Sequence, residues 1–470
     1  MKTLKIHFVV CYIFLFSSNG CLQNNISNEG WDKLDEILNQ IVEPVFPDKN
    51  YDVTFYGAVS DGSYDCTDAF RKAIDECSKN GGGKVTVPEG TYLTGAIHLK
   101  SNVNLYISEK AVIRFMKDKS KYLPVVFTRW EGVECMNYSP LIYAYGEENI
   151  AVTGKGTLDG QASNENLPDD KTGWWSWKGN KTDGWTEGMP NQKKDRDLLF
   201  QMAENNVPPE ERIFGDGHYL RPNFIQPYKC KNILIEGITI KDSPMWFIHP
   251  VLCENVTVKN VRVEGLGPNN DGCNPESSKN VLIENCYFDT GDDCIAIKSG
   301  RNNDGRRINI PSENIIIQNC VMKEGHGGVV IGSEISGGVK NVFAEDCTMS
   351  SPNLDRAIRI KTNAVRGGVI ENLYFRNITV GEVKEAVIKI DYYYEEGDKG
   401  NFLPVVRNLD ISNVTSEKSE YAIWIKAFPN SPVEKIKLSN CIFNNVEKEN
   451  VLENVEAIEK KSVVINNKEF

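Results

Sequence analysis

The sequence predicts an all-β fold: a right-handed parallel β-helix with N-terminal capping helices and a long loop insertion. A short unit recurs in which Asn follows Lys, Glu or Arg, alternating apolar residues come next, and Asn or Asp precedes an apolar residue or Cys. The Asn recurs at intervals of 25, 34, 27, 31 and 36 residues, at Asn255, Asn280, Asn314, Asn341, Asn372 and Asn408. Intervals of this size are typical of solenoids. Each unit alternates with a period of two and no helical pattern lies between units, which indicates stacked strands.

The recurring Asn and Cys positions predict ladders along the coil, with Asn side chains bonded to backbone or to one another at a bend. An antiparallel sandwich would instead need hairpin turns between the strands. The chain has 13 cysteines, and several occupy one position of the repeat. We therefore expect buried thiols rather than a disulfide framework. No pair of cysteines has the spacing of zinc ligands, so structural zinc is not expected.

The first 20 residues have the layout of a secretory signal: Lys2 and Lys5, then a short apolar run, then small polar residues. The apolar run is about half the length of a membrane span. Cys21 follows directly, as the lipidated first residue follows a bacterial lipoprotein signal. We expect an exported protein that is periplasmic, outer-membrane-anchored or extracellular, with membrane attachment only through a lipid anchor at Cys21.

Residues 21–50 are expected to form an N-terminal capping segment, because apolar side chains from Trp31 to Ile41 fall on one helical face. A second helical face runs from Phe70 to Cys77 and ends at three consecutive glycines. A solenoid must cover its ends, so both helices are predicted to be caps. The domain that follows is predicted to span residues 51–470.

Residues 161–220 interrupt the repeat with a polar insertion that contains four of the eight tryptophans, Trp174, Trp175, Trp177 and Trp185. Long insertions on solenoids usually lie over the binding face. The tryptophans would either stack on a ligand or form the core of the insertion itself. A further loop around Gly305 would wall off one end of the same groove.

The composition excludes several classes of protein. The chain has 470 residues and a formal net charge of −12, with 40% hydrophobic and 25% charged residues. This mix excludes wholesale disorder, and the acidic balance argues against nucleic acid as a partner. A polyanionic ligand would need a local basic site.

Asp271 lies 21 residues before Asp292, and Asp293 follows. In a solenoid, a step of about one coil moves a side chain by about 4.8 Å along the axis, so we expect these carboxylates to lie side by side. Repulsion among them should raise at least one pKa. A protonated acid beside an ionised base is what hydrolysis of a glycosidic bond requires. An acidic cluster could alternatively bind calcium.

Two further motifs follow. His326 is flanked by glycines, which permit close approach of backbone or ligand. Arg359 and Lys361 are two residues apart on a predicted strand, so both cations lie on the same face. In an acidic protein this pair suggests a site for an anionic group.

Together these motifs resemble the polygalacturonase family of glycoside hydrolases (family 28). The matching segments are Asn269-Asn270-Asp271, Gly291-Asp292-Asp293, Gly325-His326-Gly327 and Arg359-Ile360-Lys361, in the family's order. The segment from Phe55 to Gly62 also resembles the entry to pectin-active β-helices. Asn270 departs from the usual Thr of the family.

The resemblance implies a role for each matched residue. Asp292 would be the general acid, Asp271 and Asp293 would activate the attacking water, and His326 would hold the protonation state of the acid. Asn269, Arg359 and Lys361 would bind substrate. A tyrosine of the run 392–394, with Tyr392 the best match, would line the same subsite.

The implied function is hydrolysis of α-1,4-galacturonosyl bonds of pectin with inversion. The stretch from Ser243 to Pro250 resembles the exo-acting branch, which releases galacturonate from chain ends. Endo-polygalacturonase or a rhamnogalacturonan-directed galacturonidase is the alternative. A calcium-dependent pectin lyase and a non-catalytic pectin-binding β-helix are less favoured. We expect a pectic polysaccharide or oligogalacturonide as substrate, no cofactor, no metal and a monomer.

Overall fold

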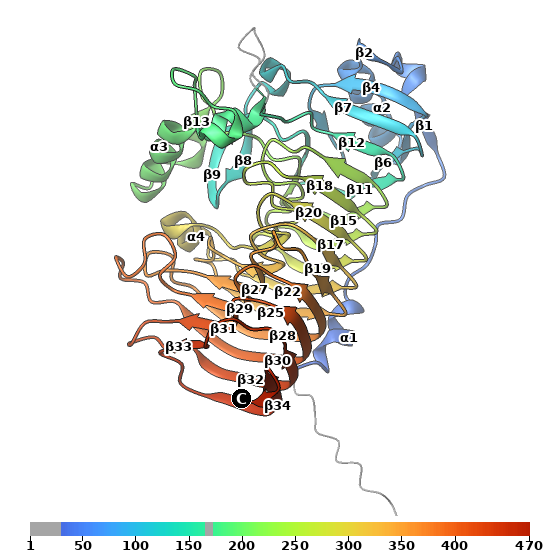
Figure 1. Cartoon of the computed structure of the whole chain (residues 1–470). Coiled ribbons are helices and arrows are strands. Elements are labelled where there is room, and N and C mark those ends of the chain that lie inside the picture. Colours follow the sequence, from blue (N-terminus) through green and yellow to red (C-terminus); the bar gives the residue numbers. More distant parts are fainter. Residues whose placement is uncertain (1–29, 165–172) are drawn as a thin grey trace, which may run out of the picture.

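The computed structural model describes residues 30–164 and 173–470. These form the predicted right-handed parallel β-helix, in which three ladders of strands wind around one continuous apolar core (Figure 1). Strands of successive coils pair in parallel, and the antiparallel pairs among the described strands are β8–β9 and β34–β35. No helix in the described residues is long and apolar enough to cross a membrane.

The first ladder runs the whole length of the coil. Its strands are β1 (Asn50–Asp52), β3 (Gly83–Val87), β6 (Val103–Ile107), β11 (Glu148–Gly154), β15 (Lys231–Glu236), β17 (Glu254–Lys259), β19 (Lys279–Glu284), β22 (Ser312–Gln318), β25 (Val339–Glu345), β28 (Val369–Glu382), β30 (Val405–Lys418), β32 (Glu434–Phe443) and β34 (Ile458–Ile465).

The second ladder joins the first where β28 lengthens. Its strands are β2 (Asp61–Asp65), β4 (Gly90–Thr94), β7 (Ala111–Phe115), β12 (Thr157–Asp159), β16 (Thr239–Lys241), β18 (Arg262–Gly265), β20 (Tyr287–Thr290), β23 (Val321–Met322) and β26 (Thr348–Met349).

The third ladder consists of short strands joined by single bridges at Ile248 and Cys273. Its strands are β5 (Ile97–His98), β10 (Ile142–Tyr145), β14 (Ile225–Tyr228), β21 (Ile295–Ile297), β24 (Val329–Ile331), β27 (Arg356–Lys361), β29 (Ala386–Asp391), β31 (Tyr421–Lys426) and β33 (Val451–Glu453). The strand ends of this ladder carry most of the functional candidates.

The remaining elements are shorter or lie outside the coil. They are α1 (Lys33–Leu38), α2 (Thr67–Lys79), α3 (Lys193–Glu204), α4 (Asn302–Ile308), β8 (Val126–Trp130), β9 (Val133–Asn137), β13 (Ile213–Phe214), β35 (Lys468–Glu469), and the 3-10 turns η1 (Val53–Tyr56), η2 (Lys119–Tyr122), η3 (Trp174–Lys178), η4 (Lys181–Asp183) and η5 (Pro209–Glu211).

The predicted ladders are confirmed. In one run, Asn314 donates to Asn280, Asn341 to Asn314, and Asn372 to Asn341, at 2.9–3.1 Å. Each of these residues has a φ of 56–60°, a left-handed bend that Asn tolerates better than other non-glycine residues. The 11 cysteines within the described residues are all buried and free. Cys11, Cys21 and the predicted signal lie outside the described residues.

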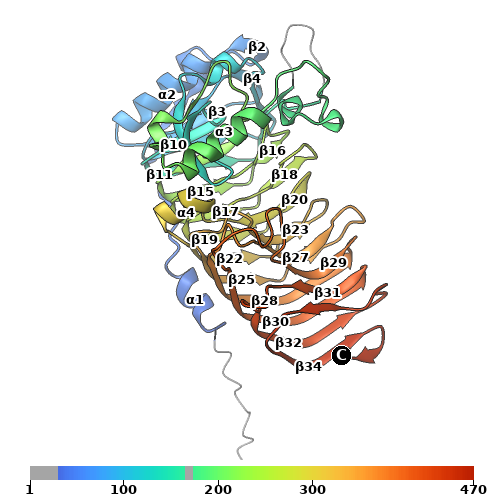
Figure 2. The same ribbon diagram turned by 90° about the vertical axis from the view of Figure 1, so that its left-hand side faces the viewer.

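The two predicted caps behave differently. Helix α2 packs on β1 and β3 and covers the N-terminal end of the coil, as expected. Helix α1 does not cap an end, and that prediction was wrong. It lies against the outside of the first ladder near β19 and β22, where Trp31 packs against Phe343 and Tyr374 (Figures 1 and 2). Its apolar face covers outward-pointing apolar side chains of the sheet, such as Ile316 and Phe343, rather than the open end of the core.

The insertion at 161–220 contains a 12-residue helix, α3, where only loop was expected. Two of its four tryptophans join the apolar core of the coil, so they form neither a stacking surface nor a separate core of the insertion. Trp174 and Trp177 are buried against each other, and Tyr122 packs on Trp174 while Tyr138 and Tyr219 pack on Trp177. The hairpin β8–β9, which the repeat pattern did not reveal, protrudes on the same side as α3 and α4 (Figure 1).

Candidate active site

The register of the third ladder brings the predicted acidic residues together. Cys273 pairs with Ile295, so Asp271 stands opposite Asp293, and the true step between coils is 22 residues rather than 21. Asp292 precedes Asp293 at the turn that enters β21. One oxygen from each of these three carboxylates lies within 4.8 Å of the others. The sequence-based expectation that they lie side by side is confirmed.

Each carboxylate has a different set of partners. Asp271 accepts a hydrogen bond from Asn274 Nδ2 at 2.9 Å. Asp292 Oδ1 lies 3.0 Å from His326 Nδ1, and Asp293 forms ion pairs with Lys361 Nζ at 2.6 Å and Arg359 Nη1 at 3.4 Å. Because these partners are mostly cationic, they oppose binding of a further cation. Independence from metal stays a prediction.

The different environments separate the protonation states of two of the acids. Burial, followed by the charge of Asp292, raises the pKa of Asp271 to about 8. Burial also opposes ionisation of Asp292, but the hydrogen bond and charge of His326 outweigh it and lower the pKa of Asp292. The same contact raises the pKa of His326 to about 9. At neutral pH the unliganded site therefore holds one proton on Asp271 and one on the His326–Asp292 pair.

The raised pKa of Asp271 predicts a pH-dependent cost to stability. Between its ordinary value of 3.8 and about 8, the native protein keeps a proton that the unfolded chain releases. The free energy of unfolding from this group therefore falls as pH rises through that interval. Asp271→Asn, which cannot ionise, should raise Tm by a margin that grows from about pH 4 to about pH 8.

Thermal unfolding followed by circular dichroism at several pH values measures this margin. Asp197→Asn on the exposed face of α3 serves as the control, and its Tm should follow that of the wild type. A margin for Asp271→Asn that does not change with pH would contradict the proton assignment.

The cation pair Arg359 and Lys361 faces the acidic cluster, as predicted. Both lie on β27, and together they carry two positive charges against the single carboxylate of Asp293. One positive charge is therefore unbalanced and available for an anion. Tyr394 joins this pair, since its ring centroid lies 5.5 Å from Arg359 Cζ and 5.3 Å from Lys361 Nζ.

The assignment of Tyr392 to this subsite was wrong. Tyr392 is fully buried in the core of the coil, where it packs on Phe428. Strand β29 directs Ile388 and Ile390 inward, and Tyr392 continues that alternation just beyond the strand. Tyr394 is the member of the run that lines the pocket.

Asn269 and Asn270 differ in role. Asn269 lines the pocket, and its Oδ1 accepts hydrogen bonds from Lys178 and Arg221. Asn270 is fully buried and donates to the carbonyls of Ser243 and Met245, both at 2.9 Å. The residue that departs from the family pattern therefore braces the loop behind the site.

The glycine beside His326 allows two coils to approach closely. Gly325 has a φ of +148°, and a Cβ built on it would lie 2.4 Å from the carbonyl oxygen of Asp292. Any larger residue would push His326 away from Asp292. The predicted close approach is thus between backbone and backbone.

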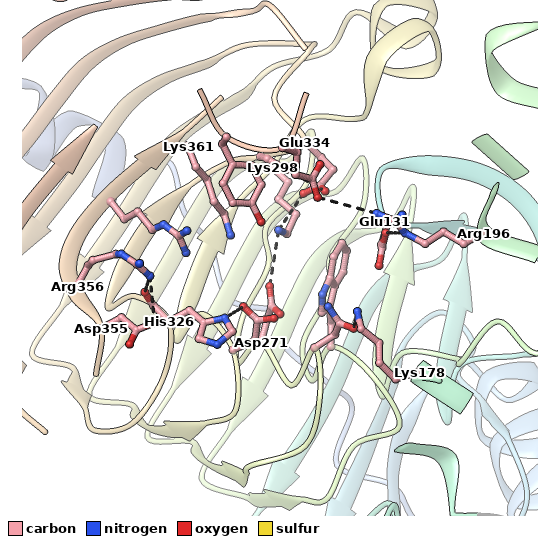
Figure 3. Close-up of a pocket in the computed structure, with 17 residues that line it drawn as sticks. Glu131, Lys178, Arg196, Asp271, Lys298, His326, Glu334, Asp355, Arg356 and Lys361 are labelled. Carbon is pink, nitrogen blue, oxygen red and sulfur yellow. Dashed lines mark hydrogen bonds and ion pairs between the residues drawn. The ribbon is translucent and has the colours of Figure 1, made fainter. Parts of the chain in front are cut away.

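One pocket of about 400 Å³ is lined by seven of these residues: Asn269, Asp271, Asp292, His326, Arg359, Lys361 and Tyr394 (Figure 3). Asp293 is fully buried and does not line it. Several of its lining residues were not predicted. Lys298 Nζ lies 3.7 Å from Asp271, 3.1 Å from Glu334 and 4.6 Å above the ring of Trp246. Lys298 and Glu334 follow β21 and β24. A charged residue just beyond a short apolar strand was therefore the sequence signal that could have identified them. The other additions are Glu131, Lys178, Arg196, Ser333, Asp355, Arg356 and Glu395.

A chain of ion pairs encloses one side of the pocket. Arg196 of α3 contacts Glu131 at the tip of the β8–β9 hairpin at 2.8 Å and Glu395 beyond β29 at 4.0 Å. Arg301, just before α4, contacts Glu395 at 3.3 Å and Glu334 at 3.5 Å. Five separate segments are thereby joined around the pocket. Arg306 and Arg307 of the predicted loop lie in α4 and do not line the pocket.

Comparison with known proteins gives a family and a set of relatives. A model described as Glycosyl hydrolases family 28 matches residues 215–463, and one described as Rhamnogalacturonase A/epimerase, pectate lyase-like matches residues 51–109. A "Probable polygalacturonase" of Vitis vinifera is 29% identical over 82% of this chain and 72% of its own. An "Exo-poly-alpha-D-galacturonosidase" of Dickeya chrysanthemi is 27% identical over 79% of this chain and 62% of its own. The crystal structure of a hyperthermoactive exopolygalacturonase from Thermotoga maritima is 47% identical, covers 94% of this chain and 97% of its own, and has a TM-score of 0.90.

Proposed function

We propose, from the premise that this chain belongs to glycosyl hydrolase family 28, that it is an exo-acting polygalacturonase that releases galacturonate from the ends of pectic chains. The observation that carries the proposal is the pocket itself. Three carboxylates converge there beside a cation pair with one unbalanced positive charge, and ion pairs enclose one side. A uronate polymer can enter such a pocket only by its end.

The proposed reaction is a single displacement at the anomeric carbon. Asp292 donates a proton to the glycosidic oxygen as the bond from that oxygen to the anomeric carbon breaks. A water held between Asp271 and Asp293 forms the new bond to carbon and gives its proton to that pair. His326 supplies the proton that Asp292 lacks in the unliganded site, through their 3.0 Å contact.

Inversion is part of the proposal and follows from the family resemblance. One oxygen from each carboxylate lies within 4.8 Å of the others, whereas the two carboxyl groups of inverting enzymes are usually about 6.5–9.5 Å apart. The spacing alone therefore does not support this outcome. Proton NMR of the first product decides it, because inversion of an α-linkage releases the β-anomer. Initial release of the α-anomer would make one of the aspartates a nucleophile.

The mode of attack is tested by a time course on polygalacturonate. We expect monomeric galacturonate from the first time point and a slow fall in viscosity, because the closed side admits only a chain end. Arg196→Ala should let longer early products appear, since it removes the contacts of α3 with Glu131 and Glu395. Lys194→Ala, exposed on the same helix, is the control. Rapid loss of viscosity with mixed oligomers from the intact protein would indicate a cleft open at both ends.

The proposal extends to location. The charged and apolar pattern of residues 1–20 supports export, and Cys21 supports a lipid anchor. Metabolic labelling with a fatty acid, compared between the wild type and Cys21→Ser, tests the anchor.

A further inference from the structure

One corner of the pocket carries positive charge that forms no ion pair with a carboxylate of the described residues. Among the described residues, six lysines and arginines line the pocket. Five have a carboxylate partner: Arg196 with Glu131, Lys298 with Glu334, Arg356 with Asp355, and Arg359 and Lys361 with Asp293. The sixth, Lys178, donates instead to the neutral amide oxygen Asn269 Oδ1 at 2.6 Å.

A second cation lies behind the first. Arg221 is fully buried and donates from Nη2 to the same Asn269 Oδ1 at 2.7 Å. Its other donors go to Gln192 Oε1 and to the carbonyls of Pro244 and Pro268. No carboxylate in the described part of the chain forms an ion pair with either Lys178 or Arg221. Two positive charges therefore converge on one uncharged oxygen.

The acids nearest to this corner are already paired. Glu131 contacts Arg196, and Asp292 contacts His326. Burial lowers the pKa of both Lys178 and Arg221, that of Arg221 to about 10, and the charge of Glu131 offsets this cost of burial only in part. A bound anion would remove that cost.

The position of Lys178 is fixed by its surroundings. It ends η3, whose Trp174 and Trp177 are buried, and Trp175 Nε1 donates to the carbonyl of Ser243 at 2.9 Å. Figure 3 shows Lys178 and Lys361 on opposite sides of Asp271, with Lys178 on the side of Glu131 and Arg196. A ligand group at Lys178 therefore lies toward the enclosed side of the pocket.

We propose that Lys178, backed by Arg221, binds the carboxylate of the terminal galacturonate that is released. The pocket would then hold two uronate carboxylates, one at Lys178 and one at Arg359 and Lys361, on either side of the catalytic aspartates. The proposal rests on the proposed function. It makes the enzyme selective for a chain end whose last sugar is an unesterified uronate.

The proposal is tested by measuring kcat/KM of the wild type and of Lys178→Met on two substrates. One is digalacturonate, and the other is digalacturonate methyl-esterified on its terminal, non-reducing sugar. A hydrogen bond to a charged group contributes about 1.5–3 kcal/mol, or about tenfold to hundredfold in kcat/KM. The wild type should prefer the free acid by that factor. Lys178→Met should lose the same factor on the acid, change little on the ester, and so lose the preference.

The matched control is Lys181→Met, an exposed lysine three residues further along the insertion, which should keep the wild-type preference. Equal losses by Lys178→Met on acid and ester would overturn the proposal, because a merely structural role would not depend on the substrate carboxylate. If the wild type hydrolyses neither compound, the proposed function fails. In that case, calorimetric binding of galacturonate, with galactose for comparison, tests the carboxylate site separately from catalysis. Weaker binding of galacturonate by Lys178→Met than by the wild type supports the site. Equal binding by the two proteins, or no binding by the wild type, overturns it.

Discussion

Asp292→Asn is expected to lower kcat on oligogalacturonates by about 10²–10⁴-fold, the usual contribution of a general acid. The substitution removes the proton donor with almost no change in volume. The amide can still accept from His326, whose Nδ1 lies 3.0 Å from Asp292 Oδ1. KM should therefore change little. Tm at neutral pH should fall, because the lowered pKa of Asp292 and the raised pKa of His326 mean that their contact stabilises the native state.

A galacturonide with an aryl leaving group separates the acid role from a base role. An aryl oxide leaves without protonation, so Asp292→Asn should lose much less activity on that substrate than on digalacturonate. Asp289→Asn on neighbouring β20, outside the pocket, is the control for the chemical change. Near-full activity of folded Asp292→Asn would show that Asp292 is not the general acid. Equal losses of activity on both substrates would indicate that Asp292 acts as a base.

The second large effect is expected at the cation pair. Arg359→Ala or Lys361→Ala should lower kcat/KM by about tenfold to hundredfold, because a substrate carboxylate loses a charge-assisted partner. Each substitution also removes one of the two ion pairs of Asp293. The decrease in kcat/KM should be larger for Lys361→Ala than for Arg359→Ala. Lys361 forms the shorter contact with Asp293, 2.6 Å against 3.4 Å.

Lys389→Ala provides the matched control. Lys389 pairs in register with Arg359 on the next strand, but it contacts Glu385 and does not line the pocket. Its kcat/KM should stay close to that of the wild type. Unchanged kcat/KM in both Arg359→Ala and Lys361→Ala would contradict recognition of a carboxylate at this place.

The coil and the centre of the site could be predicted from the sequence, because both follow from the register of the repeat. Asn280, Asn314 and Asn341 mark the bends, and a step close to one coil predicts that Asp271 meets the Asp292–Asp293 pair. The periphery follows no such rule. Lys178 and Glu131 reach the pocket from segments outside the repeat, and their approach depends on how those segments fold back.

The wrong predictions for Tyr392 and for α1 have the same physical origin. Periodicity indicates which residues share a face, but it does not indicate what that face packs against. Tyr392 obeys the alternation of β29 and is therefore buried, whereas Tyr394 lies far enough beyond the strand to turn toward Arg359. The amphipathic pattern of α1 correctly indicates one buried face. It does not specify that the face covers the outside of the sheet at Phe343 rather than the end of the coil.

The position of α1 affects how the coil loses its structure. In a simple solenoid each coil contacts only its neighbours, so the ends can fray without disturbing the middle. Here the segment from α1 to β1 runs along the outside of the coil, anchored at Phe343 and Tyr374 at one end and paired with β3 at the other. Lys259 holds it midway through an ion pair with Glu43. The N-terminal coils can therefore fray only if this segment, which is anchored several coils away, is also released. This couples their unfolding to that of the middle of the coil and makes the unfolding transition more cooperative than the stacking of coils alone would.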